Sequence, residues 1–214
     1  MNAWRSLGVL SAAVVVAIAP ARAATTQVLQ NLHGDVHYAS PGDGAARSAL
    51  APHASVVLND DDVAETGSDS MAALTLADSS QIIMASNSVL KFDTFSLTHI
   101  AHAHVVIFNG KMRFKVNHPA GARADYTFTT TTGEIAVRGT EGDIAVDPVD
   151  GVRLNVYRLS DDTLPVHVTM IDGSQYDIPA GQKIWMRWTS GKLVAKVTPI
   201  TPEEIKRFEE LGPP

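Results

Sequence analysis

The stretch from Tyr126 to Val146 constrains the fold most strongly, because its apolar and polar side chains alternate with a period of two. This period is typical of strands that bury one face, whereas a helix repeats every three or four residues. Two short turn sequences, Thr132-Gly133 and Arg138-Gly139-Thr140, divide the stretch. We expect Gly139 to adopt a turn conformation that a residue with a Cβ atom reaches only at a cost. The stretch therefore predicts three strands separated by two turns.

Short alternating strands continue on both sides of this stretch, separated by turn residues at a spacing of about ten residues. They are expected near residues 28–38, 57–58, 72–76, 82–84, 90–95, 105–116, 152–156, 166–170, 176–178, 184–188 and 193–197. Asn109-Gly110 is the preferred two-residue turn, so 105–116 is expected to be a hairpin. Residues 202–211 predict a short helix, with proline and acids at its start. The expected fold is all-β, with many short antiparallel strands and hairpins in a β-roll, solenoid-like or sandwich domain, and one short C-terminal helix.

The N-terminus has the pattern of a secretory signal peptide. Arg5 precedes an apolar run over 7–19, and Pro20 and Ala21-Arg22-Ala23 follow with a small-x-small cleavage pattern. The alternative is a membrane anchor, but the run is shorter than the roughly 20 residues that span a bilayer. We expect a signal peptide at 1–23, a β domain at 24–200, a C-terminal helix and tail at 201–214, and export to the periplasm without later membrane insertion.

Charge and cysteine content narrow the classes of partner. The chain has no cysteine, which excludes disulfides and cysteine metal sites. Its formal net charge is −6, and loss of Arg5 and Arg22 with the leader makes it −8. A negative net charge argues against nucleic acid and anionic membranes as partners. No motif implies a cofactor.

Two groups of side chains invite a metal hypothesis. His99, His102 and His104 lie close in sequence, and on a strand the last two would share a face. We favour solvated polar positions for them, with a metal-binding or pH-sensing site as the alternative. The acidic run 60–62 lacks the spacing of a calcium-binding loop, so it predicts a solvated turn.

Tyr176, Trp185, Arg187 and Trp188 form the candidate binding residues. Tryptophan, tyrosine and arginine are enriched at the energetic centres of protein interfaces. In the alternative interpretation, which we favour on the sequence, Trp188 belongs to the core and Trp185 packs beneath the C-terminal helix.

Several short motifs, in this order and spacing, resemble the FecR-domain family. They are Gly34-Asp35-Val36, Glu65-Thr66-Gly67, Leu76-Ala77-Asp78-Ser79-Ser80-Gln81-Ile82, Asn109-Gly110-Lys111, Val137-Arg138-Gly139-Thr140 and Ala180-Gly181-Gln182. The resemblance covers about 28–196. Two positions depart from the family pattern: Ser79 stands where glycine is common, and Gly142 where a large apolar residue is common.

The resemblance implies an all-β domain. Full-length FecR regulators have a cytoplasmic anti-sigma segment and a membrane helix before a periplasmic receptor-binding module. Here the domain would follow directly on the signal peptide, which implies a stand-alone periplasmic FecR-like protein without the anti-sigma segment.

The favoured function is a non-enzymatic binding or scaffold module that engages another cell-envelope protein or a cell-wall component, with a role in envelope signalling. The sequence has no GxSxG, HExxH or cysteine nucleophile, so we expect no enzyme activity. Two alternatives are a metal-responsive sensor built on the histidines, and an envelope hydrolase with an unrecognised carboxylate pair. Oligomeric state is open.

Overall fold

The structure is a computed structural model that describes residues 27–43, 46–98, 100–117, 124–159 and 164–210, the last four as backbone only. The expected signal peptide at 1–23 and His99 lie outside the described residues. Within them the chain forms 17 strands, a short 3-10 helix η1 (Pro41–Asp43) and one α-helix, α1 (Pro202–Glu210). The all-β prediction with one short C-terminal helix is confirmed.

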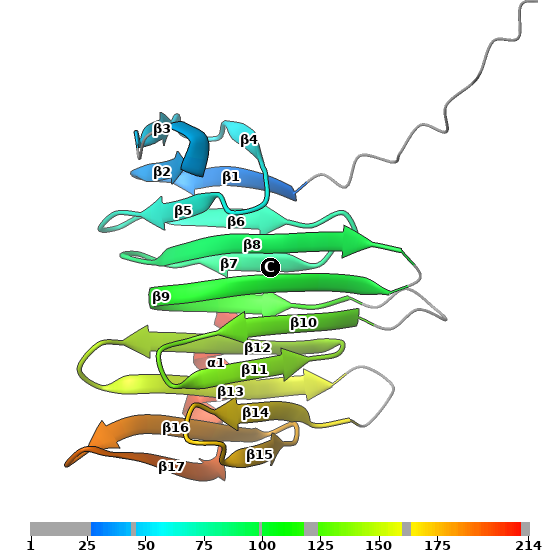
Figure 1. Cartoon of the computed structure of the whole chain (residues 1–214), viewed down its shortest axis with the longest axis vertical. Coiled ribbons are helices and arrows are strands. Elements are labelled where there is room, and N and C mark those ends of the chain that lie inside the picture. Colours follow the sequence, from blue (N-terminus) through cyan, green and yellow to red (C-terminus); the bar gives the residue numbers. More distant parts are fainter. Residues whose placement is uncertain (1–26, 44–45, 99, 118–123, 160–163, 211–214) are drawn as a thin grey trace, which may run out of the picture.

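The strands form two sheets that share one long strand, β9 (Ala101–Lys115) (Figure 1). Sheet A runs β4 (Ser55–Leu58), β1 (Gln27–His33), β6 (Met71–Thr75), β7 (Gln81–Met84), β9, β12 (Thr140–Asp147), β13 (Gly151–Leu159), β16 (Gln182–Thr189), β17 (Lys192–Pro199). Sheet B runs β3 (Ser48–Leu50), β2 (Val36–Ala39), β5 (Val63–Thr66), β8 (Val89–Leu97), β9, β10 (Ala124–Thr129), β11 (Gly133–Val137), β14 (Val166–Met170), β15 (Gln175–Ile178). Every pair is antiparallel except β9 with β10.

The core lies between the two sheets, where the apolar phase of each strand points inward. In β10 the side chains alternate between buried and half-buried, and Tyr126 and Phe128 are buried. Phe128 of sheet B meets Phe114 of sheet A with 5.1 Å between ring centroids. The strands succeed one another along the long axis of the molecule, from β1–β4 at one end to β14–β17 at the other (Figure 1).

The stretch 126–146 forms β10, β11 and β12, which confirms the three predicted strands. The turn at Arg138-Gly139-Thr140 does more than reverse the chain. β11 pairs within sheet B and β12 within sheet A, so the turn carries the chain from one sheet to the other. Gly139 has φ +84°, the left-handed conformation expected for it.

The hairpin predicted at Asn109-Gly110 is wrong. The strand β9 continues through both residues from Ala101 to Lys115. Its first half pairs with β8 and β10, and its second half with β7 and β12. The two residues therefore permit the bend at which one strand leaves sheet B and joins sheet A, where a hairpin would have ended the strand.

The helix α1 begins after Thr201, at the end of β17, and in Figure 1 it lies behind the strands of sheet A. Glu204 of α1 contacts Lys183 of β16, so the helix covers part of the outer face of sheet A. Among the described residues, no helix is long and apolar enough to cross a membrane.

Candidate functional site

The outer face of sheet A carries a row of outward-facing residues that crosses five strands. The register pairs Lys111 with Ala145, Ala145 with Arg153, Arg153 with Trp185, and Trp185 with Lys196. Because neighbouring strands lie about 4.8 Å apart, the row is about 19 Å long. All five residues occupy the outward phase of their strands, opposite to the core residues. The row thus places one tryptophan between two cations, with a third cation at its far end.

Trp185 is held in place at its edge and over one face. Its indole Nε1 donates a hydrogen bond to the backbone oxygen of Asp150 at 2.9 Å. The guanidinium carbon of Arg187 lies 4.2 Å from the ring centroid, a cation–π arrangement. The alternation in β16 explains the geometry, because Ile184 and Met186 are buried and their odd-numbered neighbours point outward. The side chain of Trp185 stays 37% exposed.

Three adjoining hollows follow this row and share Arg153, so they form one groove. The largest, about 480 Å³, is lined by Asp150, Arg153, Lys183, Trp185, Lys196 and Thr198. The lining of a second hollow, about 390 Å³, includes Lys111 together with Asp150, Arg153 and Trp185. We call the combined surface the sheet A groove and define it by Lys111, Asp150, Arg153, Trp185 and Lys196.

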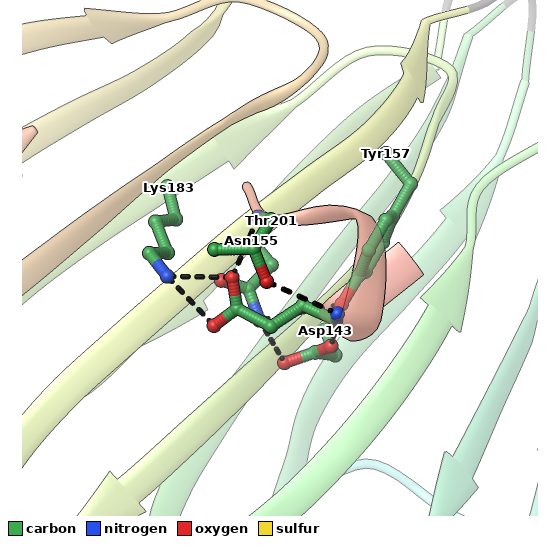
Figure 2. A network of polar contacts seen from close by, with 6 residues as sticks. Asp143, Asn155, Tyr157, Lys183 and Thr201 are labelled. Atoms are coloured by element: carbon green, nitrogen blue, oxygen red, sulfur yellow. Dashed lines mark hydrogen bonds and ion pairs between the residues drawn. The ribbon is translucent and has the colours of Figure 1, made fainter. Parts of the chain in front are cut away.

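The third hollow, about 140 Å³, forms the end of the groove beside α1, where Asp143, Asn155, Tyr157 and Glu204 line it. Figure 2 shows this polar network. Asn155 Nδ2 donates to Asp143 Oδ1 at 3.0 Å, and the Tyr157 hydroxyl donates to Asp143 Oδ2 at 2.8 Å. Burial, together with the charge of Asp143, raises the pKa of Tyr157 well above its usual value. Tyr157 therefore stays protonated and donates to the carboxylate.

The side-chain oxygen of Asn155 is an unsatisfied hydrogen-bond acceptor within the described residues of this network. Its side chain is 94% buried, and within the described residues its Oδ1 has no hydrogen-bond partner. The amide cannot simply be turned over, because Oδ1 would then face the carboxylate of Asp143. A buried acceptor without a donor is energetically unfavourable.

A capping box anchors α1 beside the same hollow. The Thr201 amide donates to Glu204 Oε2 at 2.9 Å, and the Glu204 amide donates to Thr201 Oγ1 at 3.3 Å. Lys183 Nζ lies 2.6 Å from both carboxylate oxygens of Glu204. Burial is the largest single effect and raises the pKa of Glu204, but the hydrogen bonds from Lys183 and Thr201 together hold that pKa below its ordinary value. Glu204 thereby joins the helix start to β16.

The structure separates the four predicted binding residues. Trp185 and Arg187 share the outer face of sheet A, as described above. Trp188 lies at the end of β16 and is 53% exposed, so its placement in the core is wrong. It has the inward phase, but at that point the strand has run past the core. Tyr176 lies in β15 of sheet B, opposite Val168, and is half-buried.

Of the histidines within the described range, His104 is held on both sides of its ring. Its Nδ1 lies 2.8 Å from Asp93 Oδ2, and its Nε2 lies 2.8 Å from Thr129 Oγ1. Hydrogen bonds from Lys91 and then His104 lower the pKa of Asp93. His102 shares the face of His104 but pairs with Asp125, at 3.4 Å. In the part of the chain that the structure describes, no three His, Asp or Glu side chains are grouped to hold a metal ion.

The acidic run at 60–62 forms a turn whose carboxylates have protein partners. Asp61 pairs with Lys91 at 2.8 Å, Asp60 accepts from the Phe95 amide, and Asp62 accepts from the Asn59 amide. Asp62 is buried, so the prediction of a solvated turn is wrong for this residue.

Sequence reasoning missed Arg153, Lys196, Asp143 and Asn155. Each occupies an outward position in an alternating strand, which looks like an ordinary solvated position when each strand is taken alone. The row can be recognised only when the order of the strands in the sheet is known, because it joins residues up to 85 positions apart in the chain.

Comparison with protein families identifies one match. The model of the "FecR protein" family matches residues 62–159, from the end of the acidic turn to the end of β13. Residues 62–159 are thus similar to the FecR family model, over a shorter range than the expected 28–196. No curated protein matches the chain significantly in sequence.

One of the solved structures that align with this chain shares its fold. A crystal structure named "putative anti-sigma factor", from Parabacteroides distasonis ATCC 8503, aligns with a TM-score of 0.53 at 16% identity, over 69% of this chain and 64% of that chain. A second structure of the same name and organism aligns with a TM-score of 0.49 at 18% identity, over 63% of this chain and 58% of that one. This chain thus spans less than two thirds of the length of either. At these identities, the first alignment shows a shared fold and nothing finer.

Proposed function

Because residues 62–159 match the FecR family model, we propose that this protein is a non-enzymatic binding or scaffold module of the cell envelope. It engages another envelope protein or a cell-wall component through the sheet A groove. Export through cleavage after Ala23 brings it to the periplasm. In that compartment it takes part in envelope signalling.

The observation that carries this proposal is the position of Trp185. An aromatic side chain that is fixed by a hydrogen bond and a cation–π contact, yet over one third exposed, loses little conformational entropy when it binds a partner. It also borders the two larger hollows of the groove, between Arg153 and Lys196. Tryptophan and arginine at the centre of a surface are the residue types that contribute most to binding energy.

The general behaviour of the family supports a binding role. FecR and anti-sigma proteins act in general by binding and not by catalysis. Asp143 is engaged by neutral hydrogen-bond donors, and Glu204 is engaged by Lys183 and by its own helix cap. These roles are structural, and they make the pair a poor acid–base couple.

The proposal is tested by affinity capture from envelope extract with the C-terminally tagged chain, expressed from its full sequence. Trp185→Ala is compared with Trp188→Ala, because both remove an exposed indole from β16 but only Trp185 lines the groove. We expect one envelope component that wild type and Trp188→Ala retain, and that Trp185→Ala loses by about tenfold or more, which corresponds to about 1.4 kcal/mol.

The same preparation tests export, since the purified chain should begin at Ala24 and come from the periplasmic fraction. A circular dichroism spectrum equal to that of wild type shows that each variant is folded. Equal capture by all three proteins, or capture of nothing, would contradict the proposed function.

A further inference from the structure

We propose that two copies of this chain associate through the open edge of β17, antiparallel to each other, with a two-fold axis at Ala195. This inference goes beyond the proposed function and does not depend on it, because it concerns the edge of sheet A and not the groove on its face. Three features of β17 support it: a row of backbone groups without a partner strand among the described residues, an apolar inner face that is incompletely covered, and a charge pattern that fits itself in one register.

The strand β17 is the last strand of sheet A. In the part of the chain that the structure describes it pairs with β16 alone, and it lies at one end of the stack (Figure 1). An edge strand presents a row of N–H and C=O groups with which another strand can pair. Proteins often keep such strands very short, but β17 has eight residues. The edge is therefore long enough to accept a second strand.

The turn before β17 determines which residues carry these groups. Ser190 and Gly191 have φ of +52° and +75°, and the register pairs Thr189 with Lys192. In such a two-residue turn the flanking residues are hydrogen-bonded to each other, and hydrogen-bonded pairs then recur at every second position. The even-numbered residues of β17 therefore bond to β16. The odd-numbered residues face the open edge, and those that carry both an N–H and a C=O are Leu193, Ala195 and Val197.

The same odd-numbered residues have their side chains on the inner face of sheet A, where the core is incompletely covered. Leu193 and Ala195 are half-buried against the core, and Val197 is 37% exposed. Trp188, which pairs with Leu193, is also exposed. Edges that stay unpaired commonly carry an inward-pointing charge, and these positions carry none. A further strand on this edge would extend the inner face and bury more of this apolar surface.

A two-fold axis at Ala195 pairs the edge with itself. It sets Ala195 against the partner's Ala195, and Leu193 against the partner's Val197. Because these residues carry the groups at the open edge, each such pair exchanges both backbone hydrogen bonds. The axis runs perpendicular to the sheet, so the inner faces of both copies lie on the same side and the apolar row continues from one copy into the other. A two-fold interface must be self-complementary, and β17 meets that condition.

Charge favours this register over the two adjacent ones. On the outer face it sets Lys196 against the partner's Val194, and Lys192 against the partner's Thr198. Moving the axis to Val194 would set Lys192 against the partner's Lys196, and moving it to Lys196 would set that lysine against the partner's Lys196. Like charges directly opposite each other are destabilising. The two lysines therefore disfavour both adjacent registers.

Backbone chemistry disfavours the registers beyond these. An axis at Val197 would bring Pro199 into the pairs at the edge, and proline has no N–H to donate. An axis at Leu193 would pair only the beginning of the strand, because β17 starts at Lys192. The register with its axis at Ala195 therefore satisfies the most backbone groups and opposes no lysines.

Sedimentation equilibrium of the purified chain measures the association directly. As the protein concentration rises to about 1 mM, the average mass should rise from that of one chain to that of two and then level off. Two substitutions at one exposed position test the register, because Val194→Glu would attract the partner's Lys196 and Val194→Lys would repel it. We expect the first to tighten the dimer by about threefold or more and the second to weaken it by a similar factor, since each change acts at both symmetry-related pairs.

Cysteine substitutions test the register independently, because the chain has no cysteine of its own. Val194→Cys and Lys196→Cys chains, mixed in reductant and then oxidised, should form a disulfide-linked dimer. The Cα atoms of such a directly opposed pair without hydrogen bonds lie about 4.5 Å apart, within reach of a disulfide. Neither variant should link to itself. Lys192→Cys mixed with Lys196→Cys is the matched control, because both cysteines lie on the same exposed face but are not opposed in this register, so no linked dimer is expected.

A mass of one chain at every concentration would overturn the inference, as would a mass that continues to grow beyond two chains. Equal effects of the two substitutions at Val194, or a disulfide in the control mixture, would also overturn it. A circular dichroism spectrum equal to that of wild type shows that each variant is folded. Absence of the dimer leaves the proposed function standing, because envelope capture depends on Trp185 on the outer face of sheet A, and failure of capture while the dimer forms overturns the proposed function alone.

Discussion

At the scale of single residues, Ser79 carries backbone strain in the turn between β6 and β7. Its φ is +66°, a left-handed conformation that residues with a Cβ atom adopt at a cost. The turn is otherwise well supported, because Asp78 accepts hydrogen bonds from the Ser80 amide and from the hydroxyl of buried Tyr126, at 2.9 and 2.7 Å. Glycine, common at this position in the family that the sequence resembles, would relieve the strain.

We therefore expect Ser79→Gly to stabilise the protein by about 0.5–1 kcal/mol, measured as the free energy of unfolding in urea. Ala77→Gly is the matched control, since Ala77 is exposed in the same turn and its φ is negative. It should destabilise slightly, because glycine adds entropy to the unfolded chain without relieving strain. Destabilisation by Ser79→Gly equal to that of the control would contradict the explanation.

The second departure from the family pattern, Gly142, also has a local cause. It pairs in register with Phe114, and a Cβ atom on it would lie 2.7 Å from the Phe114 ring and 2.5 Å from the Asn155 carbonyl oxygen. Phe114 therefore fills the space that a large side chain at position 142 would need. The apolar side chain at this point of the core therefore comes from Phe114 of β9, and not from residue 142 of β12.

At the scale of elements, β9 determines how the two sheets are joined. It is 15 residues long, and its middle is Asn109-Gly110, where the register with β8 also shifts. Gly110 has φ +98°, and a Cβ atom there would lie 2.4 Å from Ser88 Cα. Because that contact is with backbone, a side chain could not rotate away to make room. Only glycine permits both the bend and the close approach.

Gly110→Ala should lower the free energy of unfolding by about 3 kcal/mol or more, since strain in φ and a backbone clash add together. Asn109→Ala, which loses one exposed hydrogen bond to the Asn87 carbonyl, should cost no more than about 1 kcal/mol. Denaturant titration of both variants measures the difference. Similar losses for the two would mean that β9 tolerates a side chain at its bend.

At the scale of the whole molecule, β9 and one continuous core bind the two ends together. The buried cluster extends from Leu29 in β1 to Met186 in β16. A stack in which each layer touched only its neighbours would tend to unfold from its ends. Here a strand common to both sheets links the layers on either side of it.

We therefore expect one cooperative unfolding transition. Trp185 and Trp188 are the only tryptophans after residue 23, so fluorescence reports the end of the stack at β16, whereas far-ultraviolet circular dichroism reports all strands. The two midpoints in urea should coincide. Phe114→Ala, about 3–5 kcal/mol less stable because of the lost core ring, should shift both midpoints together. A fluorescence transition that precedes the loss of strands would show that the β16 end unfolds independently.

Much of the fold could be predicted from the sequence because strand identity is a local property. The period of two in β10, β11 and β12, and the glycine in the turn before β12, depend only on neighbouring residues and on the steric limits of the backbone. Asn109-Gly110 shows the limit of such reasoning. The dipeptide permits positive φ, but whether it ends a strand or bends one depends on the strands beside it.

The groove could not be predicted from the sequence, because it too depends on which strands lie side by side. Alternation predicts that Arg153 and Trp185 point away from the core, but their pairing is a contact between strands whose order the local pattern does not specify. Trp188 has the inward phase, yet it is exposed because β16 extends beyond the core at that point. The alternation of side chains between the two faces of a strand follows from backbone geometry, so the sequence alone predicts it. Which side chains come into contact, and whether other residues cover them, is decided only when strands that are distant in the sequence pack together.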